Sequence, residues 1–235
     1  MPKRILDIAL SGILLILTFP LVAIAAVVIK MESGDSAVFC QLRTGRGFKA
    51  FRLFKLRTMR CCCAGSAYTL GSDPRITRAG RWLRRFKIDE LPQLWNVLCG
   101  DMSMVGPRPV IPELTQEFRG SYERLLTVRP GLTDPATLKY CREAEILALV
   151  SDPLSHFMTV VTPDKLRISD AYLENASVWS DMRVLLDTAA ALLAPLRFAQ
   201  TGPQVQEQGL RVRPVDLVVA AEGNTGDRAI VAQTA

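Results

Sequence analysis

Asp89 and Glu90 are neighbouring acidic residues that directly follow the most basic part of the chain. Two adjacent carboxylates can divide a group transfer between them, because one can attack as a nucleophile while the other binds a metal ion. Residues 36–87 contain thirteen Lys and Arg residues against one acid, Asp73. Such a block attracts phosphates in nucleic acid, anionic lipid headgroups or nucleotides. The pattern indicates phosphoryl-transfer chemistry, although a basic block is also typical of a solvated surface.

Asp89 also has a purely structural explanation. Apolar residues recur at helical spacing through this region, at Ile88, Leu91, Leu94, Trp95 and Leu98. They predict an amphipathic helix over residues 90–98 that ends at Gly100. An aspartate before such a helix is a favourable N-cap, and Glu90 favours the positive helix end. Capping accounts for Asp89 about as well as catalysis does.

The rest of the composition restricts the chemistry. His156 is the only histidine, so little material exists for a histidine base or a histidine-rich metal site. The six cysteines lack the paired spacing of a zinc site, and the three adjacent thiols at 61–63 favour a reducing cytosol. A carboxylate and a lipid phosphate are already anions, so neither needs a base before it attacks phosphorus. A divalent metal and arginines would reduce the repulsion between these anions.

The amino-terminal residues 5–29 carry Asp7 as their only charge, and about 20 apolar residues suffice to cross a bilayer. A cleaved signal peptide, a straight spanning helix and a re-entrant helix are the alternatives. Pro20 removes a backbone donor and bends or breaks a helix. Cations stand at both ends of the segment, namely Lys3, Arg4 and Lys30. Cations at both ends favour a cytoplasmic place for each end. The re-entrant helix is therefore slightly favoured, with the Ser11 and Thr18 hydroxyls as partners for the freed backbone groups.

The remaining chain predicts a helix-rich α+β fold. Residues 37–43 and 48–58 are β-type segments separated by a loop with two glycines, which is typical of a short β-hairpin. Ser72–Asp73 is a helix-start signal before a basic helix in the latter part of residues 74–86. In Gly106–Pro109, an arginine between two prolines is held ready to bind a phosphate or a carboxylate. Further helices are predicted over residues 112–124 and 142–150.

A late helix has an apolar face. Its members are Trp179, Met182, Leu185, Leu186, Ala189, Leu192, Leu193 and Leu196. Because Asp181, Arg183 and Asp187 lie on the other side, a core helix or an amphipathic helix lying on a membrane interface is favoured over a second crossing. The whole chain then divides into a re-entrant membrane helix (1–32), a cytoplasmic catalytic domain (33–199) and a polar tail (200–235). The cysteines at 61–63 and Gly65–Ser66 predict a loop within the domain.

Several motifs in order resemble those of the bacterial sugar transferases, the monotopic phosphoglycosyl transferases. They are the proline-broken apolar segment, Phe54–Met59, Ser72–Arg78, Ile88–Val97, Gly100–Pro109 and Arg129–Thr133. The resemblance covers about residues 1–195. Members of this family transfer a sugar phosphate from a nucleotide sugar to polyprenyl phosphate. The resemblance also implies a re-entrant amino-terminal helix, which decides between the topologies left open above.

The resemblance implies roles for particular residues. Asp89 is expected to be the nucleophile, forming a phosphosugar-aspartyl intermediate, and Glu90 to bind Mg²⁺. Arg84 and Arg108 match positions associated with phosphate or nucleotide binding. Arg78 and Arg57, which lie in two of the motifs, complete the expected substrate-binding set.

The resemblance further implies a UDP-sugar donor, undecaprenyl phosphate as the acceptor, release of UMP, and a place on the cytoplasmic face of the bacterial inner membrane. A homodimer is possible, and the sequence does not decide the oligomeric state. The chain departs from many members at Phe19–Pro20, where a Ser-Pro pair is common, and at Thr133–Thr137, so the sugar is not specified. Two rival classes are a membrane-tethered nucleic-acid-binding protein and a non-catalytic membrane scaffold. No nucleic-acid-binding signature accompanies the basic block.

Overall fold

The computed structural model describes residues 2–60 and 73–193. The chain divides into a unit of residues 1–200 and a second unit of residues 201–235, and the following description concerns the first. The predicted loop at Cys61–Cys63 and the predicted polar tail lie outside the described residues.

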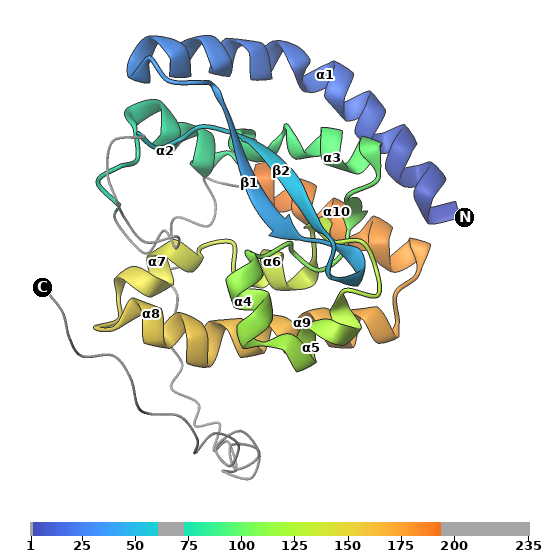
Figure 1. Cartoon of the computed structure of the whole chain (residues 1–235). Helices are drawn as coiled ribbons and strands as arrows, with labels where there is room; N and C mark the ends of the chain where they lie inside the picture. The colour runs from blue at the N-terminus through green and yellow to red at the C-terminus, as the bar shows by residue number, and fades with distance from the viewer. Residues whose placement is uncertain (1, 61–72, 194–235) are drawn as a thin grey trace, which may run out of the picture. The chain divides into compact units, whose positions relative to one another are not determined.

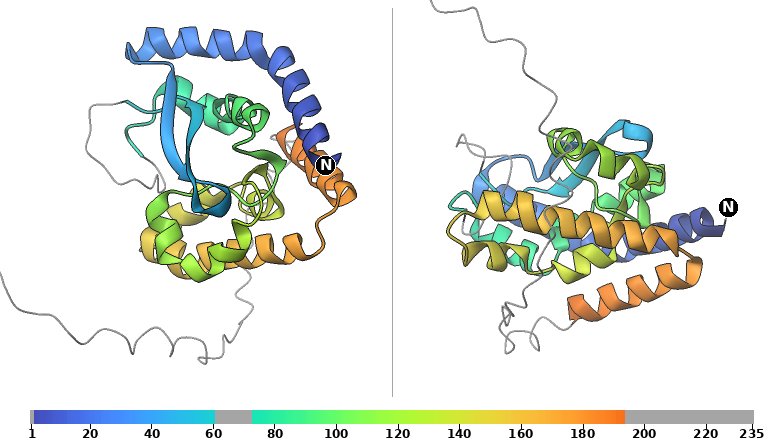
Figure 2. Two further views of the ribbon diagram at one scale, coloured as in Figure 1. Left: turned by 45° about the vertical axis from the view of Figure 1, so that its right-hand side comes forward. Right: turned by 90° about the horizontal axis from the view of Figure 1, so that it is seen from below.

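Helix α1 (Pro2–Ser33) is a single long helix with Pro20 in its interior. It is about 48 Å long at 1.5 Å per residue, and its ribbon bends along its course (Figures 1 and 2). The helix is long and apolar enough to cross a membrane. Its exposed large apolar side chains include Ile13, Ile16, Leu17, Phe19, Leu21 and Ile24. The Thr18 hydroxyl donates to the Leu14 carbonyl (2.7 Å), one turn back, and the Ser11 hydroxyl donates to the Ile8 carbonyl (3.2 Å).

The predicted hairpin is confirmed. Strands β1 (Val38–Thr44) and β2 (Ala50–Leu56) pair antiparallel, from Val38 opposite Leu56 to Thr44 opposite Ala50. The connecting turn η1 (Arg46–Phe48) places Gly47 at a φ of 64°, a left-handed conformation that glycine adopts without steric cost.

The helices around the acidic pair differ in detail from the prediction. Helix α2 (Arg78–Arg85) begins after Thr77, whose Oγ1 accepts a hydrogen bond from the Gly80 amide (2.9 Å). Thr77 therefore caps the helix, and Ser72–Asp73 does not start it. The predicted helix over residues 90–98 is divided into the 3₁₀ turn η2 (Ile88–Glu90) and helix α3 (Gln93–Cys99). Gly100 ends α3 as expected, at a φ of 97°.

A second, two-stranded sheet pairs β3 (Ser103–Val105) parallel to β4 (Gly131–Thr133). Two glycines let the strands approach closely at one end. A Cβ on Gly131 would lie 2.1 Å from the Gly106 nitrogen, so no larger residue fits there. In the sequence, β3 and β4 are separated by α4 (Pro112–Glu117) and α5 (Arg119–Leu125). These two helices replace the single helix predicted over residues 112–124.

The remaining helices follow β4 and complete the fold (Figure 1). They are α6 (Pro135–Lys139), α7 (Glu143–Ala148), α8 (Pro153–His156), the π-helical turn η3 (Phe157–Val161), α9 (Thr162–Glu174) and α10 (Val178–Leu193). The helix predicted over residues 142–150 corresponds to α7. A buried apolar cluster joins β2, α3, β3 and α10 through Leu53, Leu94, Val97, Met102, Met104, Val105 and Val184. The helix-rich α+β class is thereby confirmed.

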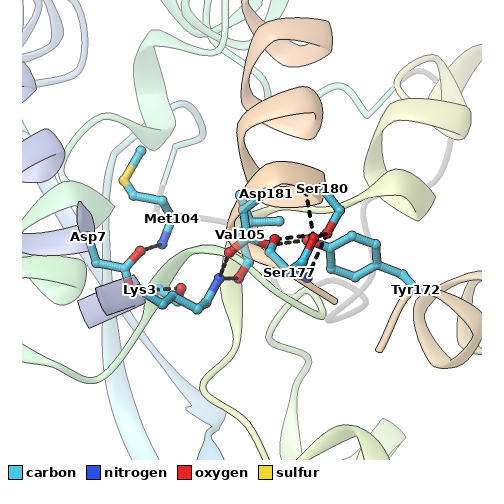
Figure 3. Close-up of polar contacts among 9 residues, drawn as sticks. Lys3, Asp7, Met104, Val105, Tyr172, Ser177, Ser180 and Asp181 are labelled. Carbon is cyan, nitrogen blue, oxygen red and sulfur yellow. Dashed lines mark hydrogen bonds and ion pairs between the residues drawn. The ribbon is translucent and has the colours of Figure 1, made fainter. Parts of the chain in front are cut away.

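Helix α10 does not bury its apolar face as a core helix would, whereas a helix lying on a membrane interface, the other alternative, would leave such a face exposed. Trp179 is 86% exposed and Leu186 is 65% exposed, whereas Asp181 is buried. Asp181 faces inward because it bonds the ammonium of Lys3 and the hydroxyl of Tyr172 (Figure 3). A specific pair of polar partners therefore outweighs the apolar periodicity of this helix.

Candidate active site

Asp89 lies in the turn η2 with only 7% of its surface exposed. Its Oδ1 atom is buried and has no hydrogen-bond partner among the described residues. Burial, and then the charge of Glu90, raise the pKa of Asp89 above its usual value. A buried carboxylate oxygen without a partner costs free energy, so this one is available to a ligand or reactant.

The alternative that Asp89 serves as a helix cap is wrong. Lys87 is the residue before η2, Pro92 is the residue before α3, and neither helix start receives a side-chain cap. Lys87 has a φ of 56°, a left-handed conformation that is uncommon for a residue with a side chain. Such backbone strain is concentrated at functional sites.

Glu90 is bound by the guanidinium of Arg108. Arg108 donates from Nη2 to Oε1 (2.6 Å) and from Nη1 to Oε2 (3.2 Å), which is a bidentate pair. The Lys87 ammonium lies 3.9 Å from Oε1. Burial acts to raise the pKa of Glu90, but the charges of Arg108 and Lys87 outweigh it and hold this pKa at about 2. Glu90 is therefore ionised at neutral pH, and its charge raises the pKa of Arg108.

Arg84 approaches the same site from the last turn of α2. Its Nε donates to the Thr58 hydroxyl (2.8 Å), which fixes the side chain. Burial lowers the pKa of Arg84, while the charges of Asp89 and Asp73 oppose that effect. The structure thus brings together Arg84, Asp89, Glu90 and Arg108 as the sequence predicted.

Two further cations of the site come from the hairpin and were missed. Burial, helped by the charges of Arg43 and Arg84, lowers the pKa of Lys55 to about 8. Burial and the charge of Arg108 lower the pKa of Arg43 to about 10, and its Nε has no partner among the described residues. These two residues form, with Arg84, Lys87 and Arg108, a set that we call the cation cluster. Strand alternation makes Lys55 a candidate, because it lies on the same face of its strand as the predicted Arg57.

Arg57 and Arg78 make other contacts. The Arg57 Nε donates to the Ser36 carbonyl (2.8 Å) and its guanidinium lies over the ring of Phe39. Arg78 is exposed at the opposite end of α2 from Arg84. There it lines an open groove of about 920 Å³ between α1 and α2. The groove combines apolar side chains with cations, namely Val28, Met31 and Trp82 with Arg60, Arg78 and Arg81.

A family model described as bacterial sugar transferase matches residues 1–195, which include every element of this site. The chain belongs to this family. Among curated relatives, the UDP-glucose:undecaprenyl-phosphate glucose-1-phosphate transferase of Caulobacter vibrioides is 38% identical over 197 residues, which cover 81% of this chain and 69% of the relative. The exopolysaccharide production protein PSS of Rhizobium leguminosarum is 36% identical over 205 residues, covering 81% and 94%.

The undecaprenyl-phosphate glucose phosphotransferase of Komagataeibacter xylinus is 35% identical over 195 residues, covering 79% of this chain. This chain spans only 35% of that relative's length. The residues matched by the family model include the acidic pair and the cation cluster, so the family relationship covers the region described above.

For a member of this family, the donor set can be tested against Mg²⁺. Magnesium is commonly bound through one or two carboxylates together with substrate phosphates and waters. Glu90 is ionised, and Asp89 has a buried oxygen without a partner beside it. A carboxylate oxygen that accepts one hydrogen bond keeps a second lone pair, so the contact with Arg108 leaves Glu90 able to bind a cation. The described residues contain no group of three or more acidic, histidine or cysteine side chains that could hold a metal ion, so a magnesium ion at Glu90 would also need oxygens of a bound diphosphate and waters.

Proposed function

We propose that this chain transfers a sugar 1-phosphate from a UDP-sugar to undecaprenyl phosphate through a covalent adduct on Asp89. In the first step an Asp89 oxygen attacks the phosphorus bound to the sugar. The bond from that phosphorus to the bridging oxygen breaks, and UMP leaves with the electron pair. In the second step an oxygen of the lipid phosphate attacks the same phosphorus, and the bond to the Asp89 oxygen breaks. The products are the lipid diphosphosugar and the regenerated carboxylate.

The buried Oδ1 of Asp89, which has no hydrogen-bond partner among the described residues, is the observation that carries this proposal. Glu90 is the poorer nucleophile of the pair, because both of its oxygens already accept a hydrogen bond from Arg108 and its pKa is held at about 2. The raised pKa of Asp89 makes its carboxylate more basic than an ordinary aspartate, and a more basic oxygen is a stronger nucleophile.

The cation cluster supplies the charge that the transfer needs. The diphosphate of the donor and the phosphate of the acceptor both repel the two carboxylates, and fixed arginines and lysines offset that repulsion. Arg43 has an unpartnered Nε and Lys55 has a lowered pKa, so both have capacity for an anion. A magnesium ion held by Glu90 would neutralise charge on the transferring phosphoryl group.

The contacts of α1 support a re-entrant helix on one face of the membrane. At its start, Arg4 donates to the Val97 and Leu98 carbonyls (2.7 and 2.9 Å). At its end, Glu32 accepts hydrogen bonds from the Arg78 and Ala79 amides (2.8 and 2.9 Å). Both ends are thus bonded to the same globular unit, while the middle of the helix exposes apolar side chains. A straight crossing would place the two ends on opposite sides of the bilayer.

The chemistry is tested by trapping the adduct. Purified enzyme in detergent or nanodiscs is mixed with a UDP-sugar without lipid acceptor, quenched in acid and digested for mass spectrometry. We expect a sugar-phosphate mass on the peptide that contains Asp89 and a stoichiometric burst of UMP. An adduct on another residue would refute the assignment, and the absence of both signals would refute the proposed reaction.

The topology is tested by labelling. In a background with the native cysteines replaced by serine, Pro2→Cys and Ser33→Cys should both react with a membrane-impermeant maleimide from the cytoplasmic side only. Labelling of the two positions from opposite sides would restore the spanning helix.

A further inference from the structure

Asp7 is the only charged residue in the apolar stretch of α1, and the proposed chemistry does not use it. It is 3% exposed and faces the globular unit (Figure 3). Its Oδ2 accepts a hydrogen bond from the Ser103 hydroxyl (2.9 Å) and its Oδ1 accepts one from the Met104 amide (3.0 Å). A carboxylate is costly to place in an apolar helix, so these two bonds require an explanation.

Both bonds go to strand β3, which lies between α1 and the rest of the small parallel sheet. One edge of β3 pairs with β4. On the side of α1, Asp7 takes the Met104 amide, and the Lys3 ammonium donates to the Val105 carbonyl (3.0 Å). Met104 and Val105 are buried, so these backbone groups have little access to water and need protein partners. Side chains of α1 therefore take the place of a third strand.

Strand β3 leads directly to Arg108 through a stiff connection. The Gly106 amide donates to the Thr133 carbonyl (3.0 Å), and the Gly131 amide donates to the Pro107 carbonyl (2.9 Å). Gly106 and Gly131 are too close for any side chain between them, and Pro107 fixes its own φ. Arg108 comes next and holds Glu90 with two hydrogen bonds. A shift of β3 would consequently move Arg108 relative to the acidic pair.

The start of α1 also holds the segment on the other side of that pair. Arg4 binds the carbonyls at the end of α3, and α3 begins three residues after Glu90. The chain thus forms a closed circuit in which α1 joins α3 to β3 at one end and the Glu90–Arg108 pair joins them at the other.

We propose that Asp7 is a positioning residue of the active site, whose carboxylate holds β3 in the place from which Arg108 reaches Glu90. The expected change in the reaction rate rests on the proposed function. The expected change in the position of β3 rests on the hydrogen bonds alone. It also accounts for an acid in a membrane-directed helix, because the aspartate is needed by the site and not by the bilayer.

The isosteric variant separates positioning from charge. In Asp7→Asn the amide oxygen can accept from the Met104 amide, and the amide nitrogen can donate to the Ser103 hydroxyl, so both hydrogen bonds persist. In Asp7→Leu both are lost, while the helix becomes more apolar. Ser11→Ala is the matched control, since Ser11 is buried on the same helix but its hydroxyl bonds only the Ile8 carbonyl of α1.

The experiment is the single-turnover burst of UMP with a UDP-sugar and no lipid acceptor, on the full chain in nanodiscs. The amplitude counts competent sites, and the rate constant reports the chemical step at each site. We expect Asp7→Leu to keep its amplitude and to lose about 100-fold in rate constant, the size of effect of a misplaced catalytic group. Asp7→Asn should stay within about threefold of the wild type, as a retained hydrogen bond predicts. Ser11→Ala should match the wild type.

Two results would overturn the inference. If Asp7→Leu lowered the amplitude and left the rate constant unchanged, the residue would only stabilise the fold. If Asp7→Asn were as slow as Asp7→Leu, the charge and not the hydrogen bonds would be required. Should Asp7→Leu not fold, Ser103→Ala removes one of the two bonds, and we expect a loss of about tenfold in rate constant. An unchanged rate constant in Ser103→Ala would then refute the inference.

Hydrogen–deuterium exchange tests whether Asp7 holds β3 in place. It does so even if the wild type shows no burst and the proposed reaction fails. Amides of residues 103–108 should exchange faster in Asp7→Leu than in the wild type or in Asp7→Asn. Equal exchange in all three proteins would mean that Asp7 does not hold β3.

Discussion

Two clusters of charged and polar side chains use their polar groups differently. The first, which we call the anchor cluster, consists of Lys3, Arg4, Asp7, Ser103 and Asp181, and its members bond to each other or to backbone groups. The second is the cation cluster with Asp89 and Glu90. There Asp89 Oδ1 and Arg43 Nε have no partner among the described residues, and the pKa of Lys55 is lowered to about 8.

The difference separates groups that fix geometry from groups that are available to a ligand. A satisfied buried network stiffens the structure around it, whereas an unsatisfied buried group raises the free energy of the ligand-free protein. Glu90 and Arg108 belong to the second cluster but satisfy each other, and they link it through β3 to the first. Substitutions in the two clusters should consequently have different signatures in activity and in stability.

The sharpest contrast is expected from Asp89→Asn. We expect the UMP burst rate to fall at least about 10,000-fold, as for other removed nucleophiles. The thermal midpoint at pH 7 should not fall. The pKa of Asp89 is raised in the folded state, so the unfolded chain releases this proton first and ionised Asp89 costs stability above its ordinary pKa. A neutral side chain removes that cost. Loss of activity together with a clear loss of stability would place Asp89 among the structural groups instead.

Arg108→Gln should lower both the activity and the stability. Removal of the guanidinium leaves an ionised Glu90 without its bidentate partner and takes a cation from the diphosphate. We expect the burst rate to fall about 100-fold, and the free energy of unfolding to fall by about 2 kcal/mol because the pair is only partly buried. Arg108 has a side chain that is 39% exposed, which keeps this value low.

Arg108→Lys sharpens the same test, since lysine keeps the charge and loses the two-point geometry. Urea unfolding of the purified protein and the burst assay measure the two quantities. A Lys variant as active as the wild type would show that charge alone matters at this position.

Lys3→Met should lower the stability, unlike Asp89→Asn. It leaves Asp181 buried with the Tyr172 hydroxyl as a remaining partner. We expect a loss of about 1–3 kcal/mol in the free energy of unfolding, because an uncompensated buried charge remains but Lys3 itself is partly exposed. The double variant Lys3→Met/Asp181→Leu should recover most of that loss. No recovery would mean that the ion pair is not the source of the effect.

The sequence predicted the parts of this molecule that depend on local signals. The glycines of the hairpin loop, the helical spacing before Gly100 and the arginine between two prolines are all readable from neighbouring residues, and the corresponding elements are found. The order of the motifs, through the family resemblance, singled out the acidic pair together with Arg84 and Arg108.

What the sequence did not show depends on partners far away in the chain. Asp181 faces inward on α10 because it bonds Lys3, which lies 178 residues earlier in the chain. Asp7 meets β3 across 96 residues. Alternation along the hairpin places Lys55 and Arg57 on one face but does not tell which of them approaches Asp89. Apolar spacing likewise could not show that Pro92 separates a 3₁₀ turn from α3. Local patterns predict elements, and tertiary contacts decide which side chains meet.

Lys55 provides a smaller, pH-dependent contrast. Its pKa of about 8 lies below the ordinary lysine value, so the folded protein loses this proton as the pH rises from 7 to 9. We expect the KM for the UDP-sugar to rise about threefold to tenfold over that range, because one cation near the diphosphate is lost. Lys55→Arg should flatten this rise, since arginine stays protonated.

The same proton has the opposite effect on stability. The unfolded chain keeps it to a higher pH than the folded protein, so the free energy of unfolding gains from this group between pH 8 and the ordinary lysine pKa. A higher KM at pH 9 with a thermal midpoint no lower than at pH 7 would separate lost donor binding from unfolding. A KM that does not change with pH in the wild type would remove Lys55 from the donor site.

The smallest effect is expected at Arg78, which the structure separates from the cation cluster. In the groove between α1 and α2 it lies near apolar side chains of the membrane-directed helix, an arrangement suited to a phosphate that carries a lipid tail. An exposed cation near a membrane contributes about 1 kcal/mol to such binding, so Arg78→Gln should raise the KM for undecaprenyl phosphate about fivefold. The UMP burst without acceptor should keep its rate. Arg119→Gln, at an exposed position on α5, is the control. An altered burst in Arg78→Gln would assign this arginine to the donor, and an unchanged KM for the lipid would exclude the groove from acceptor binding.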